Sequence, residues 1–132
     1  MIQEFVSYLT IKNLPYSFIN DNHSLISFKK GLINYLFSCD SQDDSHYCKI
    51  LIPNIKQYDN VCQSDFDFLN KFSSEYKVGK AMILDIQHSK HLWLEAEAFV
   101  YSYDNLNALF DRLISVVDDM FNEFKSIEDG KK

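Results

Sequence analysis

The stretch from residue 32 to residue 52 constrains the fold more than any other part of the chain. When it is folded back on itself around Asp43 and Asp44, its apolar residues face one another, whereas a slip of one residue sets Phe37 opposite Lys49. Because side chains alternate between the two faces of a strand, this pattern fixes the register of an antiparallel hairpin. The facing pairs are Tyr35 with Ile52, Phe37 with Ile50 and Cys39 with Cys48.

Three segments show the periodicity of amphipathic helices, with apolar residues three or four positions apart. The longest apolar stripe runs from Leu106 to Phe124, and the opposite side of that segment is polar. Pro15 ends the first helix, because proline cannot continue it, and Ser64 with Asp65 can cap the second. The predicted helices cover residues 2–12, 64–76 and 104–124.

The remaining apolar segments alternate as strands do, and polar turns separate them. Residues 53–60 are expected to be a connection, and Gln87 to Lys90 a turn. The order is one helix, a run of strands, a helix, two strands and a long helix. It predicts an α+β fold in which an antiparallel sheet is packed by helices on one side. We expect one domain over residues 1–126 and a frayed tail over 127–132.

Composition narrows the classes of function. The chain has 132 residues and a net charge of −6, and an acidic surface repels nucleic-acid phosphates and anionic membranes. No stretch approaches the roughly 18 apolar residues that a membrane-spanning helix needs. The N-terminus lacks the pattern of a signal peptide, and the three cysteines have no zinc-type spacing. We therefore expect a cytoplasmic protein that binds neither nucleic acid nor a membrane.

Aromatic and acidic side chains share one face of the strand that follows residue 91. The opposite face of that strand is apolar, as a core-facing side should be. The mixed face is either a solvent-facing side of the sheet or an interface, and its aromatic members favour the interface. The predicted partner-binding residues are Trp93, Glu95, Glu97, Phe99 and Tyr101.

Two enzyme readings compete with this prediction. His88 and His91, with Asp85 just before them, could hold Zn²⁺, although a predicted hairpin turn favours solvated histidines. Glu95 and Glu97 lie two residues apart on one strand, so they could divide acid and base roles. We expect neither a metal nor another cofactor, because no nucleotide-binding or hydrolase motif occurs in the chain.

The cysteines and the acidic turn have structural explanations. Cys39 and Cys48 are expected to be small core residues rather than a redox pair or, with His46, a nucleophilic dyad. Cys62 is the cysteine that we expect to be exposed. The turn at Asp40 to Ser45 lacks the glycine and the closing glutamate of a calcium-binding loop, so it is interpreted as a solvated hairpin tip.

The order of elements resembles the type III secretion chaperone-like fold, and within it the YbjN-type bacterial sensory transduction regulator family. The segments that carry the resemblance are Leu69-Asn70-Lys71-Phe72, Lys80-Ala81-Met82-Ile83-Leu84, Leu92-Trp93-Leu94-Glu95-Ala96-Glu97 and the helix from Leu106 to Phe124. The strand around Lys49 is an addition to the three-strand pattern of secretion chaperones. The resemblance implies no enzyme activity, no cofactor, and a homodimer or protein-binding surface.

We therefore expect a non-enzymatic protein-binding module, a regulator or chaperone-like protein that binds another protein or a second copy of itself. An alternative is an immunity-type protein that neutralises a toxin, because a charge of −6 suits steering toward a basic enzyme. A further alternative is the metal-dependent enzyme that uses His88 and His91.

Overall fold

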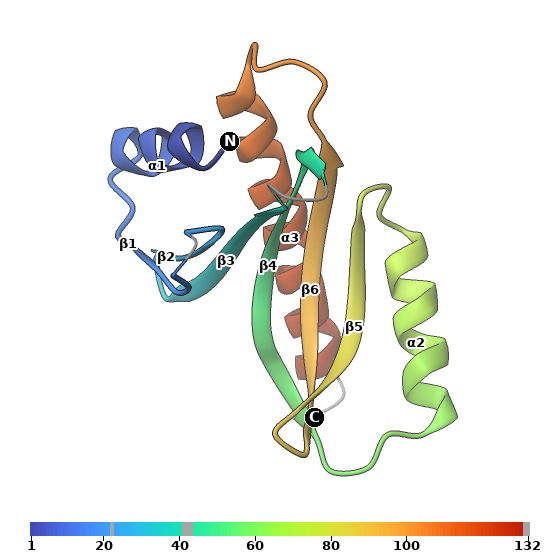
Figure 1. Ribbon diagram of the computed structural model, residues 1–132. Coiled ribbons are helices and arrows are strands. Elements are labelled where there is room, and N and C mark those ends of the chain that lie inside the picture. Colours follow the sequence, from blue (N-terminus) through green and yellow to red (C-terminus); the bar gives the residue numbers. More distant parts are fainter. Residues whose placement is uncertain (22, 41–43, 131–132) are drawn as a thin grey trace.

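The computed structural model describes residues 1–21, 23–40 and 44–130. These residues form a six-stranded antiparallel sheet with the strand order β1-β2-β3-β4-β6-β5, together with three helices (Figure 1). The α+β class with an antiparallel sheet is therefore confirmed. The elements are α1 Ile2–Ile11, β1 Tyr16–Phe18, β2 Leu25–Lys30, β3 Ile33–Asp40, β4 Asp44–Tyr58, α2 Gln63–Ser74, β5 Gly79–Ile86, β6 Ser89–Phe99 and α3 Leu106–Gly130.

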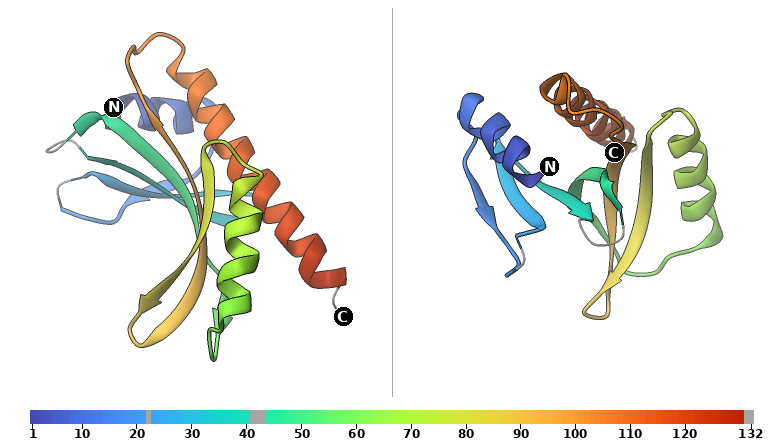
Figure 2. Two further views of the ribbon diagram at one scale, coloured as in Figure 1. Left: turned by 90° about the vertical axis from the view of Figure 1, so that its right-hand side faces the viewer. Right: turned by 45° about the horizontal axis from the view of Figure 1, so that its top comes forward.

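All three helices pack against one face of the sheet. Helix α3 runs behind the central strands β4 and β6, α1 covers the end of the sheet near β2 and β3, and α2 lies beside β5 (Figures 1 and 2). Leu92, Leu94 and Ala96 of β6 are buried under these helices, so the alternate residues of β6 point to the other face. No helix of the described chain covers that other face.

Aromatic rings join α1 to the sheet and to α3. Phe5 is fully buried, and its ring stacks on Phe37 of β3 with 3.8 Å between the ring centroids. The edge of the same ring meets Phe110 of α3 at 4.9 Å. Burying a phenylalanine side chain contributes roughly 1.5–3 kcal/mol. A ten-residue helix that is too short to be stable alone is thus held by tertiary packing.

A second group of buried residues lies under α2. Leu69 and Phe72 of α2 pack with Met120 and Phe124 of α3 above the core face of β6. The helix begins after Cys62, whose backbone N–H donates to Asp65 Oδ2 at 3.0 Å. The carboxylate of Asp65 therefore serves the N-terminus as expected, but the capping position is Cys62 rather than Ser64.

The predicted hairpin register is confirmed for two of its three facing pairs, and the described pairing begins at Leu36 with Leu51, one residue inside the predicted pair Tyr35–Ile52. Cys39 pairs with Cys48 and Phe37 with Ile50, in β3 and β4. The register shifts after Cys39, and residues 41–43 of the predicted turn lie outside the described residues.

The prediction for residues 53–60 was wrong. The expected connection at 53–60 is largely strand, because β4 continues to Tyr58 and pairs again with β6 from Lys56 onward. An irregularity between Ile52 and Lys56 accommodates Pro53, which has no N–H for a regular ladder. Helix α3 itself continues to Gly130, beyond the expected helix end at Phe124. In the part of the chain that the structure describes, no helix is both long and apolar enough to cross a membrane.

Gly79 marks a close approach between β5 and α3. A Cβ at this position would lie 2.5 Å from Met120 Sδ and 3.0 Å from Val116 Cγ1. We expect Gly79→Ala to lower the free energy of unfolding by about 1–3 kcal/mol, because overpacking displaces buried side chains. The measurement is the urea midpoint. Gly130→Ala is the matched control, because a Cβ there meets nothing within 4 Å, and equal midpoints for the two variants would contradict the close approach.

Candidate interaction surface

The sheet side without helices gathers side chains from its central and edge strands. Cross-strand pairing sets Met82 opposite Trp93, Lys80 and Leu51 on either side of Glu95, Lys49 opposite Glu97 and Tyr47 opposite Phe99. Register partners share a face, so these residues lie together. We call this surface the helix-free face; its residues are Tyr47, Lys49, Leu51, Lys80, Met82, Trp93, Glu95, Glu97 and Phe99.

Four of the five residues predicted to bind a partner lie on the helix-free face. Tyr101 lies beyond the end of β6 and is 90% exposed, but its ring stacks on Phe99 with 6.5 Å between centroids. Phe99 is 55% exposed and also contacts Tyr47 at 5.3 Å. These three rings, Tyr47, Phe99 and Tyr101, form a continuous aromatic row at one end of the face.

Trp93 occupies the other end of the helix-free face and is half-buried. Its indole N–H donates to Asn54 Oδ1 at 3.1 Å. Asn54 lies in the irregular part of β4 and has a positive φ of 55°. The break in β4 therefore supplies the acceptor that orients the indole ring.

Glu95 is the one charged residue that is buried among the described residues, with 2% of its surface exposed. Its Oε1 lies 3.0 Å from Lys80 Nζ. The hydrogen bond and the charge of Glu95 raise the pKa of Lys80. An ion pair holds the Glu95 carboxylate below the surface, so Glu95 supports the face from within rather than offering a free contact.

Glu97 is also engaged by a neighbour. The Tyr47 hydroxyl donates a hydrogen bond to Glu97 Oε2. Burial, followed by this hydrogen bond, raises the pKa of Tyr47 above its ordinary value. Glu95 and Glu97 thus share a face as predicted, but each carboxylate has its own partner on a neighbouring strand.

The proposed histidine metal site is not assembled in this structure. His91 pairs with Leu84 and shares the helix-free side, whereas Asp85 lies on the opposite side and forms an ion pair with Lys90 at 3.2 Å. His88 lies in the two-residue turn between β5 and β6, with a φ of 67°. No group of three metal-ligating side chains occurs within residues 1–21, 23–40 and 44–130.

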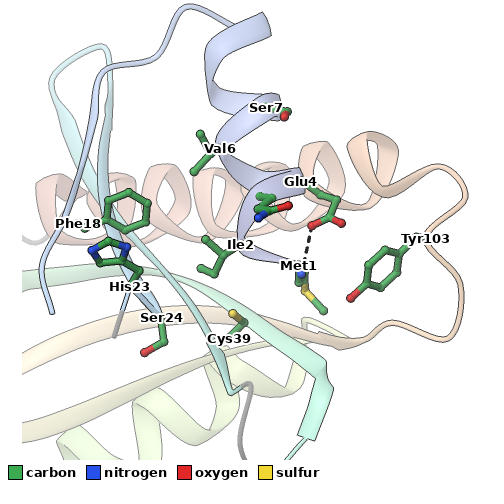
Figure 3. A pocket seen from close by; sticks show the side chains of 11 residues that line it. Met1, Ile2, Glu4, Val6, Ser7, Phe18, His23, Ser24, Cys39 and Tyr103 are labelled. Carbon is green, nitrogen blue, oxygen red and sulfur yellow. Dashed lines mark ion pairs between the residues drawn. The ribbon is translucent and has the colours of Figure 1, made fainter. Parts of the chain in front are cut away.

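A cavity of about 750 Å³ lies between α1 and the strands beneath it (Figure 3). Ile2 and Val6 line it from α1, and the stacked rings of Phe18 and His23 form another wall. Cys39 also lines it. Sequence reasoning did not predict this cavity, because it joins segments far apart in the chain.

Sequence reasoning also missed the residues that hold the helix-free face in place. Lys80, Tyr47 and Asn54 were not among the candidates, although they contact Glu95, Glu97 and Trp93. The pairing of β4 with β6 places Tyr47 on this face, and no local pattern in the sequence specifies that pairing.

Comparisons of the chain with protein-family models, with curated proteins and with solved structures gave no match. The helix-free face is therefore interpreted from its own geometry.

The ion pair between Lys80 and Glu95 gives a stability prediction. We expect Lys80→Met to lower the free energy of unfolding by about 1–3 kcal/mol, because it leaves a buried carboxylate without its cation. Urea unfolding at neutral pH measures the change. Lys90→Met is the matched control, since the Lys90–Asp85 pair is exposed and should contribute less than about 1 kcal/mol. Equal losses in the two variants would refute a special role for the Glu95 pair.

The same pair predicts the sign of a pH effect. The pKa of Lys80 is raised in the folded chain, so its stabilisation is fully present below the ordinary lysine pKa of about 10.4. It is lost as the pH rises through the folded pKa of Lys80. The difference in urea midpoint between the wild type and Lys80→Met should therefore persist at pH 7–9 and shrink at higher pH. A difference that grows with pH would contradict this assignment.

Proposed function

We propose that the chain is a non-enzymatic protein-binding module, and that the helix-free face is its binding surface. The observation that carries the proposal is the asymmetry of the sheet. Three helices cover one side, and the other side presents Trp93 at one end and the aromatic row at the other. Aromatic side chains are enriched in the cores of protein interfaces and often dominate the binding energy.

The charges of the helix-free face favour an apolar partner surface. Lys80 is paired with Glu95, and Glu97 accepts a hydrogen bond from Tyr47. The Lys80–Glu95 charges cancel within the chain and Glu97 already has a hydrogen-bond donor, so a partner does not have to supply a cation for Glu95 or a donor for Glu97 Oε2. Phe99 and Tyr101 remain exposed, and burying their rings is the favourable step in association.

The order of helices and strands supports a regulator or chaperone-like role within this proposal. One helix, a run of strands, a helix, two strands and a long helix is the arrangement on which the resemblance to the chaperone-like fold rests. In such a role the chain acts by holding a protein, which is either another chain or a second copy of itself. Catalysis is not part of the proposal.

Replacing the aromatic anchors should weaken capture of the partner. We expect Trp93→Ala to reduce binding by about 2 kcal/mol, a roughly thirtyfold loss of affinity, because a central aromatic anchor is removed. The measurement is quantitative mass spectrometry of proteins retained by the immobilised chain, followed by titration of the main retained protein. Phe66→Ala is the matched control, because Phe66 is an exposed aromatic residue on α2, outside the helix-free face.

Tyr101→Ala separates binding from stability, because Tyr101 is 90% exposed and its loss leaves the core unchanged. It should weaken capture without moving the urea midpoint. Retention of the same protein at the same affinity by the wild type, Trp93→Ala and Tyr101→Ala would refute the helix-free face as the binding surface. A steep fall of the association rate with added salt would instead favour the immunity-type alternative.

A further inference from the structure

We propose that Cys39 and Cys48 are a thiol pair that a small organic disulfide converts to a reversible intrachain disulfide. The proposal rests on the register of β3 and β4 and on the cavity beneath α1. It does not depend on the proposed binding function. Both residues are buried thiols in this structure, as expected, and their geometry adds a redox role that the sequence did not favour.

The two cysteines are direct neighbours across adjacent strands. Cys39 of β3 and Cys48 of β4 are register partners, and both side chains belong to the same buried group under α1 and α3. Their sulfur atoms therefore lie on the same face of the sheet. Cys62 is exposed and lies outside this pair, at the N-cap of α2.

The main-chain hydrogen bonds show which kind of cross-strand pair this is. The Cys39 N–H donates to the Ser24 carbonyl at 3.2 Å, so its peptide groups point toward β2 and away from β4. On the other strand, the His46 carbonyl of β4 accepts a hydrogen bond from the Val100 N–H, which follows β6, so that carbonyl points toward β6. The direction of the peptide groups repeats every second residue along a strand, so the N–H and C=O of Cys48 also point toward β6 and away from β3.

Cys39 and Cys48 are consequently a non-hydrogen-bonded antiparallel pair. In such pairs the Cα atoms lie about 4.5 Å apart, the closer of the two spacings in an antiparallel ladder. Disulfides span Cα separations of about 4.4–6.8 Å. The bond can therefore form with little movement of either strand, near the short end of that range.

The cavity gives one of the two thiols a route to solvent. Cys39 lines the cavity of about 750 Å³, and Figure 3 shows its sulfur among the lining side chains, below Ile2. A small organic disulfide fits a cavity of this volume. Cys48 is fully buried and does not line this cavity. Its burial, followed by the proximity of Cys39, raises the pKa of the Cys48 thiol to about 12.

This arrangement assigns the two thiols different roles. The Cys39 thiolate attacks one sulfur of the reagent, the reagent's S–S bond breaks, and one thiol leaves with the proton that Cys39 has lost. Cys48 then loses its proton and attacks the Cys39 sulfur, which breaks the mixed disulfide and releases a second thiol. Two protein thiols are oxidised and one disulfide is reduced to two thiols. Because the pKa of Cys48 is high, the second step is the slower one.

The bond joins β3 to β4 beside the aromatic row, because Tyr47 is the neighbour of Cys48. Closing the chain between residues 39 and 48 restricts the unfolded state, so the oxidised chain should unfold at a higher urea concentration than the reduced chain.

The test uses the folded full-length chain that carries Cys62→Ser, which removes the exposed thiol. Serine is a favoured residue at the start of a helix, so α2 should be retained. The protein is incubated with hydroxyethyl disulfide, quenched in acid and analysed by mass spectrometry and peptide mapping. We expect both remaining thiols to be lost, the mass to fall by two hydrogen atoms without retained reagent, and the urea midpoint to rise. A dithiol reductant should reverse all three changes.

Single substitutions in this background assign the roles. Cys48→Ser should stop the reaction at a mixed disulfide on Cys39, and Cys39→Ser should leave Cys48 unmodified while the chain is folded. The proposal is overturned if the folded Cys62→Ser chain keeps both thiols under conditions that modify the urea-unfolded chain. It is also overturned if Cys39 and Cys48 each retain reagent, because the sulfurs then do not meet. If Cys39→Ser or Cys48→Ser prevents folding, the Cys62→Ser chain, which keeps both core thiols, still tests the proposal.

Discussion

Helix α3 lies along the middle of the sheet, and besides apolar packing one type of hydrogen bond recurs between it and the surrounding elements. Its acidic residues accept hydrogen bonds from tyrosines that come from different parts of the chain. Tyr8 of α1 donates to Asp111, and Tyr35 of β3 donates to Asp118, which also forms an ion pair with Lys30 of β2 at 2.8 Å. Each tyrosine buries its ring and brings its hydroxyl to the edge of the core, where a carboxylate satisfies it. The polar side of α3 therefore holds α1, β2 and β3 through side-chain contacts, in addition to facing solvent.

Because all three helices pack on one face of the sheet, the side chains of the opposite face are left available for contacts with other molecules. With the core face occupied, the opposite face can keep aromatic side chains exposed without loss of fold stability. The side chains of that face are closely packed. The Glu95 carboxylate lies on a side of the sheet that no helix covers, and it is nevertheless buried by its neighbours and paired with Lys80. A surface that is ordered before its partner arrives loses little conformational entropy on binding.

The sequence carried enough information for the β3–β4 hairpin and for the two faces of β6, because both depend on strict alternation of apolar residues. It was insufficient for the extent of β4, since Pro53 normally signals the end of a strand, and the irregularity that accommodates it arises from pairing with β6. The partners of Glu95 and Trp93 were missed for the same reason. Lys80 and Asn54 become neighbours only through strand pairing and a break in β4, which residue spacing along the chain does not encode.

The two groups of buried residues are not separate units. Ile55 of β4 and both Val116 and Phe121 of α3 pack against each of them, and β4 and α3 run the length of the molecule (Figure 1). Loosening the group under α2 therefore removes support from the group under α1. We expect a chain with two apolar centres that share a strand and a helix in this way to unfold as one cooperative unit, with the backbone amides in the middle of β4 exchanging with solvent only when the whole molecule opens.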